Sequence, residues 1–205
     1  MNNKAYESHV CSHKHSFFLD NFMRRVFQNP GKIVGEYVKE GDCALDVGCG
    51  PGFFTIEMAK RVGEKGSVIA IDLQPEMLAK VERKSKKLNL SKRISLHRCP
   101  QEKIGLPEDV KADFVLAYYM VHETLDPKKL LKEIRSLLKD KGKALIVEPK
   151  FHVSEKTFKR TEMDALEAGL KVIDRPAKKG GRSLVLSVCN TCSCRMNIKT
   201  LHLSP

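Results

Sequence analysis

Three glycines directly follow a short apolar run, and their backbone, which carries no side chains, could approach a ligand closely. The stretch "CALDVGCGPGFF" contains Gly48, Gly50 and Gly52, with Pro51 between the last two. Glycine adopts left-handed backbone conformations and has no Cβ, so the chain can turn sharply and approach a ligand closely. The following run, "FFTIEMAKRV", is expected to be a helix, and the free N–H groups at its start can hold a carboxylate or a phosphate. The pattern predicts a small-molecule site at this turn.

An acidic residue ends the next apolar run and indicates which class of ligand the glycine turn would bind. Asp72 closes "SVIAID", at about the 20-residue separation from the glycines that is typical of a ribose-hydroxyl acceptor. The third glycine arrives one residue too early for the dinucleotide pattern G-x-G-x-x-G, and Pro51 lacks an N–H that a pyrophosphate would use. The triphosphate loop G-x-x-x-x-G-K-[ST] does not occur. The sequence predicts a ligand with a ribose and a small anionic end but no diphosphate.

Further polar side chains follow two later apolar runs. His122 and Glu123 come just after "ADFVLAYYM", and Glu148 ends "KALIVEP". His122 is either a base or substrate contact, or a buried residue at a helix start that bonds to backbone; we favour the second interpretation. Glu148 is either structural or faces the substrate. Tyr118 and Tyr119 should alternate across their strand, so only one of them is expected to face a ligand.

Histidines and a cysteine alternate near the N-terminus. His9, Cys11, His13 and His15 would share one face of an extended chain. Such ligands can hold zinc or copper, but the spacing matches no zinc-module pattern, and we predict no metal site. We favour a lid that leads into an amphipathic helix over residues 15–28.

A second cysteine cluster lies near the C-terminus. Cys189, Cys192 and Cys194 follow the last expected strand, which should end on the edge of the sheet opposite the ligand. A catalytic thiol is not expected there, and a flexible tail is the favoured interpretation over a surface metal site or a redox-sensitive segment.

Alternating hydrophobic periods predict the elements that position these residues. Strands are expected at 43–47, 67–72, 93–98, 112–120 and 143–149, with helices at 53–62, 74–88 and 126–139 between them and another at 30–39 before them. Lys141 and Gly142 are expected to close the helix at 126–139, and Ser154 and Gly169 to bound a helix over 154–169. The runs 170–174 and 183–188 have no helix between them and should form an antiparallel hairpin. The fold class is therefore α/β: a doubly wound, mostly parallel, seven-stranded Rossmann-like sheet with a C-terminal antiparallel strand.

Length and composition favour one domain in a reducing compartment. The chain has 205 residues, 41% of them hydrophobic, and seven cysteines. We expect a helical lid over 1–38, a cofactor-binding core over 39–188 and a flexible tail over 189–205. No run suits a membrane span or a secretory signal, so a cytoplasmic location is expected. The net charge of +12 is spread along helices without an arginine-and-aromatic cluster, which favours a solvated surface over a nucleic-acid patch.

Four stretches in this order resemble one enzyme family. The stretches "ALDVGCGPGFFTIEMA", "VIAIDLQPEML", "ADFVLAYYMVHE" and "LKDKGKALIVEPK" resemble class I S-adenosylmethionine-dependent methyltransferases, of the small quinone-biosynthesis type. The resemblance covers roughly residues 30–188 and implies S-adenosylmethionine as the cofactor.

The resemblance implies roles for individual residues. The methionine part of the cofactor would lie against the turn that contains Asp46, Gly48, Cys49, Gly50 and Gly52. Asp72 would accept the ribose hydroxyls, Leu73 would lie beside adenine, and Tyr118 would border the transferred methyl. The family's acid near the adenine amino group is missing, and Gln101 would take its place.

The expected activity is methyl transfer to a small aromatic or apolar acceptor. A sulfonium methyl is already electrophilic, so the protein must mainly align the acceptor and exclude water. His122 and Tyr118 are the candidate catalytic residues. The alternatives are transfer to a thiol or metalloid, transfer to RNA or protein, and a cofactor-binding regulator without catalysis.

Overall fold

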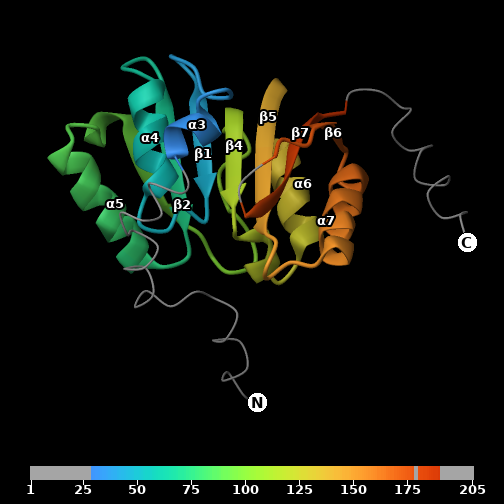
Figure 1. Ribbon diagram of the computed structural model, residues 1–205. Helices are drawn as coiled ribbons and strands as arrows, with labels where there is room; N and C mark the ends of the chain where they lie inside the picture. Colours follow the sequence, from blue (N-terminus) through green and yellow to red (C-terminus); the bar gives the residue numbers. More distant parts are fainter. Residues whose placement is uncertain (1–28, 178–179, 190–205) are drawn as a thin grey trace, which may run out of the picture.

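One mixed sheet carries the architecture of the chain (Figure 1). The computed structural model describes residues 29–177 and 180–189, and in this part of the chain seven strands are ordered β3-β2-β1-β4-β5-β7-β6. The strands are β1 (Cys43–Val47), β2 (Ser67–Asp72), β3 (Ile94–Arg98), β4 (Ala112–Tyr118), β5 (Leu138–Pro149), β6 (Leu170–Asp174) and β7 (Gly181–Val188). Strands β1 to β5 pair in parallel, and β7 lies antiparallel between β5 and β6. The predicted fold class is confirmed.

Helices cover both faces of the sheet (Figure 1). The elements are α3 (Pro30–Val34), α4 (Phe53–Arg61), α5 (Pro75–Lys87), α6 (Pro127–Leu137) and α7 (Glu155–Glu167), with short 3₁₀ turns η3 (Ser91–Arg93) and η4 (Val121–Glu123). One face packs against α3, α4 and α5, and the other against α6 and α7. The alternating apolar side chains of the buried strands therefore find a helix on either side, as a doubly wound fold requires.

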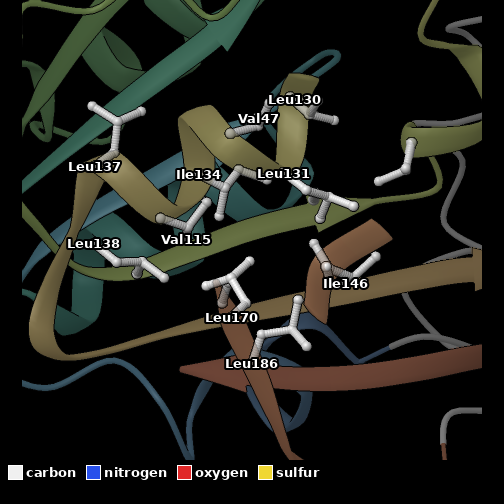
Figure 2. Close-up of a cluster of buried hydrophobic side chains, with 14 of the residues drawn as sticks. Val47, Val115, Leu130, Leu131, Ile134, Leu137, Leu138, Ile146, Leu170 and Leu186 are labelled. Atoms are coloured by element: carbon white, nitrogen blue, oxygen red, sulfur yellow. The ribbon is translucent and has the colours of Figure 1, made fainter. Parts of the chain in front are cut away.

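Figure 2 shows the core between the sheet and α6. Leu131 and Ile134 of α6 are fully buried and lie near Val115 of β4 and Ile146 of β5. Leu170 extends this cluster to β6. Truncating one such side chain to alanine typically costs about 2–5 kcal/mol of stability. The cluster therefore holds β4, β5 and β6 against α6.

Side chains cap the helices where the sequence predicts. Ser154 accepts a hydrogen bond from the Thr157 amide at 3.1 Å, and Gly169 follows α7 with a φ of 85°. Asp126 caps α6 in the same way, through the Lys129 amide at 2.9 Å. The expected bounds of the helix over 154–169 are confirmed to within two residues at each end.

Two predicted helix bounds are wrong. Helix α6 ends at Leu137, and Gly142 lies inside β5 instead of closing the helix. A Cβ on Gly142 would stand 2.7 Å from the Ala112 carbonyl oxygen, so glycine is required here by the close approach of β4 and β5, whose register shifts at this point. Helix α3 is likewise five residues long, whereas a helix was expected over 30–39.

The carboxyl ends of β1, β2, β4 and β5 meet at one edge of the sheet, where open α/β sheets bind ligands. Strand β7 runs the other way, so Cys189 follows it at the opposite edge, as predicted. Cys192 and Cys194 lie outside the described residues. Among the helices described, none is both long and apolar enough to span a bilayer.

Candidate active site

The glycine turn between β1 and α4 leaves one position open. Gly50 has a φ of 51°, and a Cβ built on it would meet no atom within 4 Å. Gly52 has a φ of 83°, and its Cβ would stand 2.9 Å from Val81 Cγ2 of α5. Both positions favour glycine, but for different reasons: Gly50 leaves space for a ligand, and Gly52 lets α5 pack against the turn.

Asp72 joins the end of β2 to this turn. Its carboxylate accepts the Gly50 amide at 2.8 Å and the Gln74 amide at 2.9 Å. The side chain is buried, which raises its pKa, while these backbone hydrogen bonds oppose the rise. Each carboxylate oxygen has a second lone pair, so the residue can still accept ribose hydroxyls.

Asp46 lies deeper, on β1. It is buried and accepts the Thr55 hydroxyl of α4 at 2.5 Å. Burial raises its pKa to about 7, against the opposing effect of the Thr55 hydrogen bond. Asp46 therefore links the start of α4 to the carboxyl end of β1 and stabilises the glycine turn between them.

A cavity of about 540 Å³ opens above these residues. Its volume lies in the range of small-ligand sites. It brings together nearly all the residues predicted for the cofactor, namely Asp46, Gly48, Cys49, Gly50, Asp72, Leu73, Gln101 and Tyr118. Gly52 is not part of its lining. Glu102, next to Gln101, also lines it, so an acid does stand near the expected position, one residue later.

Aromatic rings also line the cavity. The Tyr118 ring packs between Phe54, at a centroid distance of 4.5 Å, and Tyr119, at 4.4 Å. The expectation that only one tyrosine faces the cavity is wrong, because both line it. Tyr119 follows the end of β4 with a φ of 60°, and this left-handed turn breaks the alternation on which the expectation rested.

His122 lines the same cavity and pairs with Glu148. Its Nδ1 lies 2.5 Å from Glu148 Oε2, and Glu148 Oε1 accepts the Val121 amide at 3.0 Å. The hydrogen bond to Glu148 raises the pKa of His122, burial lowers it, and the charges of Glu148 and Glu123 raise it further. The favoured interpretation of His122 as a residue bonded to backbone is wrong, because its described partner is a carboxylate.

The loop after β5 contributes two rings that the sequence did not single out. Phe151 and His152 both line the cavity, and their ring centroids are 4.8 Å apart. His152 stacks against His122 at 6.2 Å. Their only signal in the sequence is position, since they lie between the end of a ligand-side strand and the Ser154 cap.

Arg182 of β7 holds this loop in place. Its guanidinium donates to the Val153 carbonyl at 2.8 Å, and the Lys150 amide donates to the Gly180 carbonyl at 3.1 Å. Arg182 therefore positions the backbone of this loop beside the cavity. Lys178 and Lys179, which precede β7 in the sequence, lie outside the described residues.

Part of the expected N-terminal lid falls outside the described chain. Residues 1–28, with His9, Cys11, His13 and His15, are not described. Residues 29–38 are described and contain α3, which packs against α4. None of residues 29–38 lines the cavity. Within the described ranges no group of His, Cys, Asp or Glu residues is arranged to hold a metal ion.

Comparisons with known proteins agree with this geometry. Residues 38–169 match a family described as "Methyltransferase domain". Over 112 residues the chain is 39% identical to a demethylmenaquinone methyltransferase of Lactobacillus johnsonii and 36% identical to one of Bacillus cereus. These matches cover 54% of this chain and 45% and 46% of the relatives, so the chain spans about half the length of the curated relatives it matches.

A solved structure extends the likeness over most of the chain. The crystal structure of a SAM-dependent methyltransferase from Aquifex aeolicus is 29% identical, with a TM-score of 0.77, over 86% of this chain and 98% of that one. The matched family spans the glycine turn, Asp72 and the pair of His122 and Glu148. The chain belongs to the methyltransferase-domain family and has the fold of the SAM-dependent methyltransferase from Aquifex aeolicus.

Proposed function

We propose that this chain methylates a small aromatic acceptor of the hydroquinol or phenol type. The observation that carries the proposal is one cavity that is lined by two chemically different sets of residues. The first set, the glycine turn and Asp72, would form an end that suits a nucleoside with an amino-acid tail. The second set, aromatic rings and the imidazole of His122, would form an end that suits a flat, mainly apolar acceptor.

The residues at the first end fit S-adenosylmethionine. The open space over Gly50 admits the cofactor, Asp72 would accept its ribose hydroxyls, and Asp46, Gly48 and Cys49 would lie beside its methionine part. Leu73 and Gln101 would flank adenine on the same wall. When bound, the cofactor supplies an electrophilic methyl group.

The second end would orient the acceptor. Tyr118 and Tyr119 offer ring faces, and Phe151 offers a third from the loop after β5. These contacts hold a flat ring and exclude water from it, and positioning of this kind supplies much of the rate of a methyl transfer. His122 would take a proton from an acceptor that carries one. The names of the relatives, demethylmenaquinone methyltransferases, support a quinol-type acceptor.

Residues 1–28 would complete the cavity as a lid. The support comes from the rim, where Phe151 is 75% exposed and Leu125 is 48% exposed. Both line the cavity, and the undescribed segment contains the apolar residues Phe18, Phe22 and Val26 at helical spacing. An apolar cover on this rim would shield the acceptor from water.

A transfer assay with methyl-labelled S-adenosylmethionine tests the proposal. The acceptors offered are a demethylated naphthohydroquinone, a catechol, a small thiol, arsenite and an RNA transcript. We expect label in the hydroquinol or the catechol only. Label in the thiol, arsenite or RNA would replace the proposed acceptor with the corresponding alternative. Tight cofactor binding without transfer to any of the five would favour a regulator without catalysis.

A further inference from the structure

Glu148 is a buried carboxylate beside the cavity whose two oxygens both have partners. Only 1% of its surface is exposed, at the carboxyl end of β5. Oε1 accepts the Val121 amide at 3.0 Å, and Oε2 lies 2.5 Å from His122 Nδ1. The amide contact orients the carboxylate, because Val121 is itself buried and begins the 3₁₀ turn η4.

This arrangement determines which imidazole nitrogen carries the proton. A carboxylate oxygen only accepts hydrogen bonds, so the nitrogen that faces it must be the donor. Nδ1 of His122 is therefore protonated in the neutral ring, and Nε2 has the free lone pair. The ring is partly exposed, with 24% of the side-chain surface accessible, and it lines the cavity.

We propose that Glu148 is a positioning residue that locks His122 in the Nδ1–H tautomer, so that Nε2 accepts the proton of an acceptor hydroxyl. The proposal rests on the proposed function for the acceptor, whereas the tautomer stands on the contacts of Glu148 alone. It specifies the acceptor further: a hydroxyl with a pKa above neutrality, as in a phenol or hydroquinol, gains from such a base.

The proton and electrons balance as follows. The acceptor O–H bond breaks, its proton goes to His122 Nε2, and the electron pair stays on the acceptor. The pair left on the hydroxyl oxygen forms the new bond to the methyl carbon, while the pair of the old methyl–sulfur bond leaves with the sulfur. The imidazolium that results stays beside the carboxylate of Glu148 and later releases its proton to solvent.

The groups around His122 set the direction of its pH dependence. Glu148 of β5 and Glu123 of η4 raise the pKa of the ring, and the burial of the ring lowers it, with a net rise from 6.5. The ring of His152, from the loop after β5, stacks against the His122 ring with the centroids 6.2 Å apart. Turnover should therefore rise with pH through a pKa above 6.5, because only the neutral ring accepts a proton.

The test is the isosteric substitution Glu148→Gln. The glutamine oxygen can still accept the Val121 amide, but its NH₂ group then faces Nδ1 and forces the ring proton onto Nε2. We expect ¹⁵N NMR of the free protein to show Nδ1–H in the wild type and Nε2–H in the variant, with a lower His122 pKa. Turnover should fall on the order of 100-fold or more, the scale of lost general-base catalysis, while the acceptor KM and cofactor Kd change less than about threefold.

Asp164→Asn is the matched control. Asp164 is another buried carboxylate that pairs with a basic side chain, Arg160, but it lies on α7 and outside the cavity lining. This variant should keep the His122 spectrum and the wild-type turnover. Glu148→Asp serves as a second variant, which keeps the charge but shortens the reach to His122 and should retain the Nδ1–H tautomer with reduced turnover.

The two readouts separate this proposal from the proposed function. A wild-type spectrum with the proton on Nε2, or a variant with unchanged turnover, overturns the role of Glu148 even if a hydroquinol is methylated. Failure to methylate any offered hydroxyl overturns the proposed acceptor, and the spectrum then still decides whether Glu148 sets the tautomer.

Discussion

At the scale of single residues, Asp72 should control cofactor affinity. Its carboxylate already fixes the Gly50 and Gln74 amides and has lone pairs left for the ribose. Hydrogen bonds to a charged group contribute about 1.5–3 kcal/mol each, so Asp72→Ala should weaken S-adenosylmethionine binding by at least about tenfold. Isothermal titration measures the change. An affinity equal to that of the wild type would remove Asp72 from the cofactor site.

Gly50 allows a second residue-scale prediction, with a matched control in Gly41. A Cβ at either glycine would meet nothing within 4 Å, and both have a positive φ, of 51° and 87°. Only Gly50 lines the cavity. Ala at each position should cost a similar strain of about 1 kcal/mol, visible in urea unfolding, but only Gly50→Ala should impair cofactor binding. If both variants bind alike, the turn serves packing alone.

At the scale of elements, the loop from β5 to α7 depends on a strand that follows it in sequence. Arg182 of β7 donates to the Val153 carbonyl. Arg182→Met keeps the length of the side chain but removes this bond, so Phe151 and His152 should be held less firmly. A loss of about 1–1.5 kcal/mol predicts roughly a tenfold rise in the acceptor KM.

Cofactor affinity is the internal control for this variant, since Arg182 does not line the cavity. Arg160→Met, on the exposed side of α7, controls for the loss of an arginine in general. An unchanged acceptor KM in Arg182→Met would show that the loop keeps its position without the guanidinium.

The segment before α3 gives another prediction at this scale. Deletion of residues 1–14 should lower methyl transfer more than cofactor affinity, because it removes the polar end of the proposed lid and leaves its apolar residues 15–28 in place. Steady-state kinetics with titration of the cofactor measure both effects. Full activity of the shortened chain would rule out a lid role for this polar end. Zinc or copper bound stoichiometrically to the intact chain but not to the shortened one would instead reveal a metal site.

At the scale of the whole molecule, Asp46 couples folding to pH. Its pKa is about 7 in the folded chain, above the ordinary value of 3.8. A raised pKa means that the folded state binds the proton more tightly, so this contribution is complete below pH 3.8 and is lost as pH rises to about 7. The difference between these two pKa values corresponds to at most about 4 kcal/mol of unfolding free energy.

Urea unfolding at pH 5 and pH 7.5 tests this coupling. The free energy of unfolding of the wild type should fall between the two values, and Asp46→Asn should flatten the fall because the amide does not titrate. An equal slope in both proteins would show that Asp46 does not carry the linkage.

The parts of the fold that the sequence could predict are those with local signals. Alternating apolar runs, the Ser154 cap and the glycine turn each depend on neighbours in the chain. These signals led to the correct fold class and to the cavity beside the glycine turn. The end of α6 was predicted wrongly because Gly142 resembles the glycine that ends many helices. Glycine is instead required at this position because a Cβ would collide with the carbonyl oxygen of Ala112, on another strand.

The residues of the site were likewise predictable only where they have a local signal in the sequence. Asp72 and Gly50 have a diagnostic separation, but the pair of His122 and Glu148 joins residues 26 positions apart and depends on the adjacency of β4 and β5. No pattern in a single sequence measures that adjacency. The left-handed turn at Tyr119 was equally hidden, since tyrosine has no preference for a positive φ.

The position of β7 has a consequence for synthesis on the ribosome. This strand is the last of the described strands to emerge, yet it pairs with β5 on one side and β6 on the other. Until it emerges, β5 is an open edge and β6 has no strand beside it, while the parallel strands and α4 can already assemble. The nascent chain thus passes through a stage with an exposed apolar edge, which is an opportunity for chaperones and for aggregation. Arg182 emerges with β7, so the loop that carries Phe151 and His152 is held in place only after the strands of the glycine turn and Asp72 have emerged.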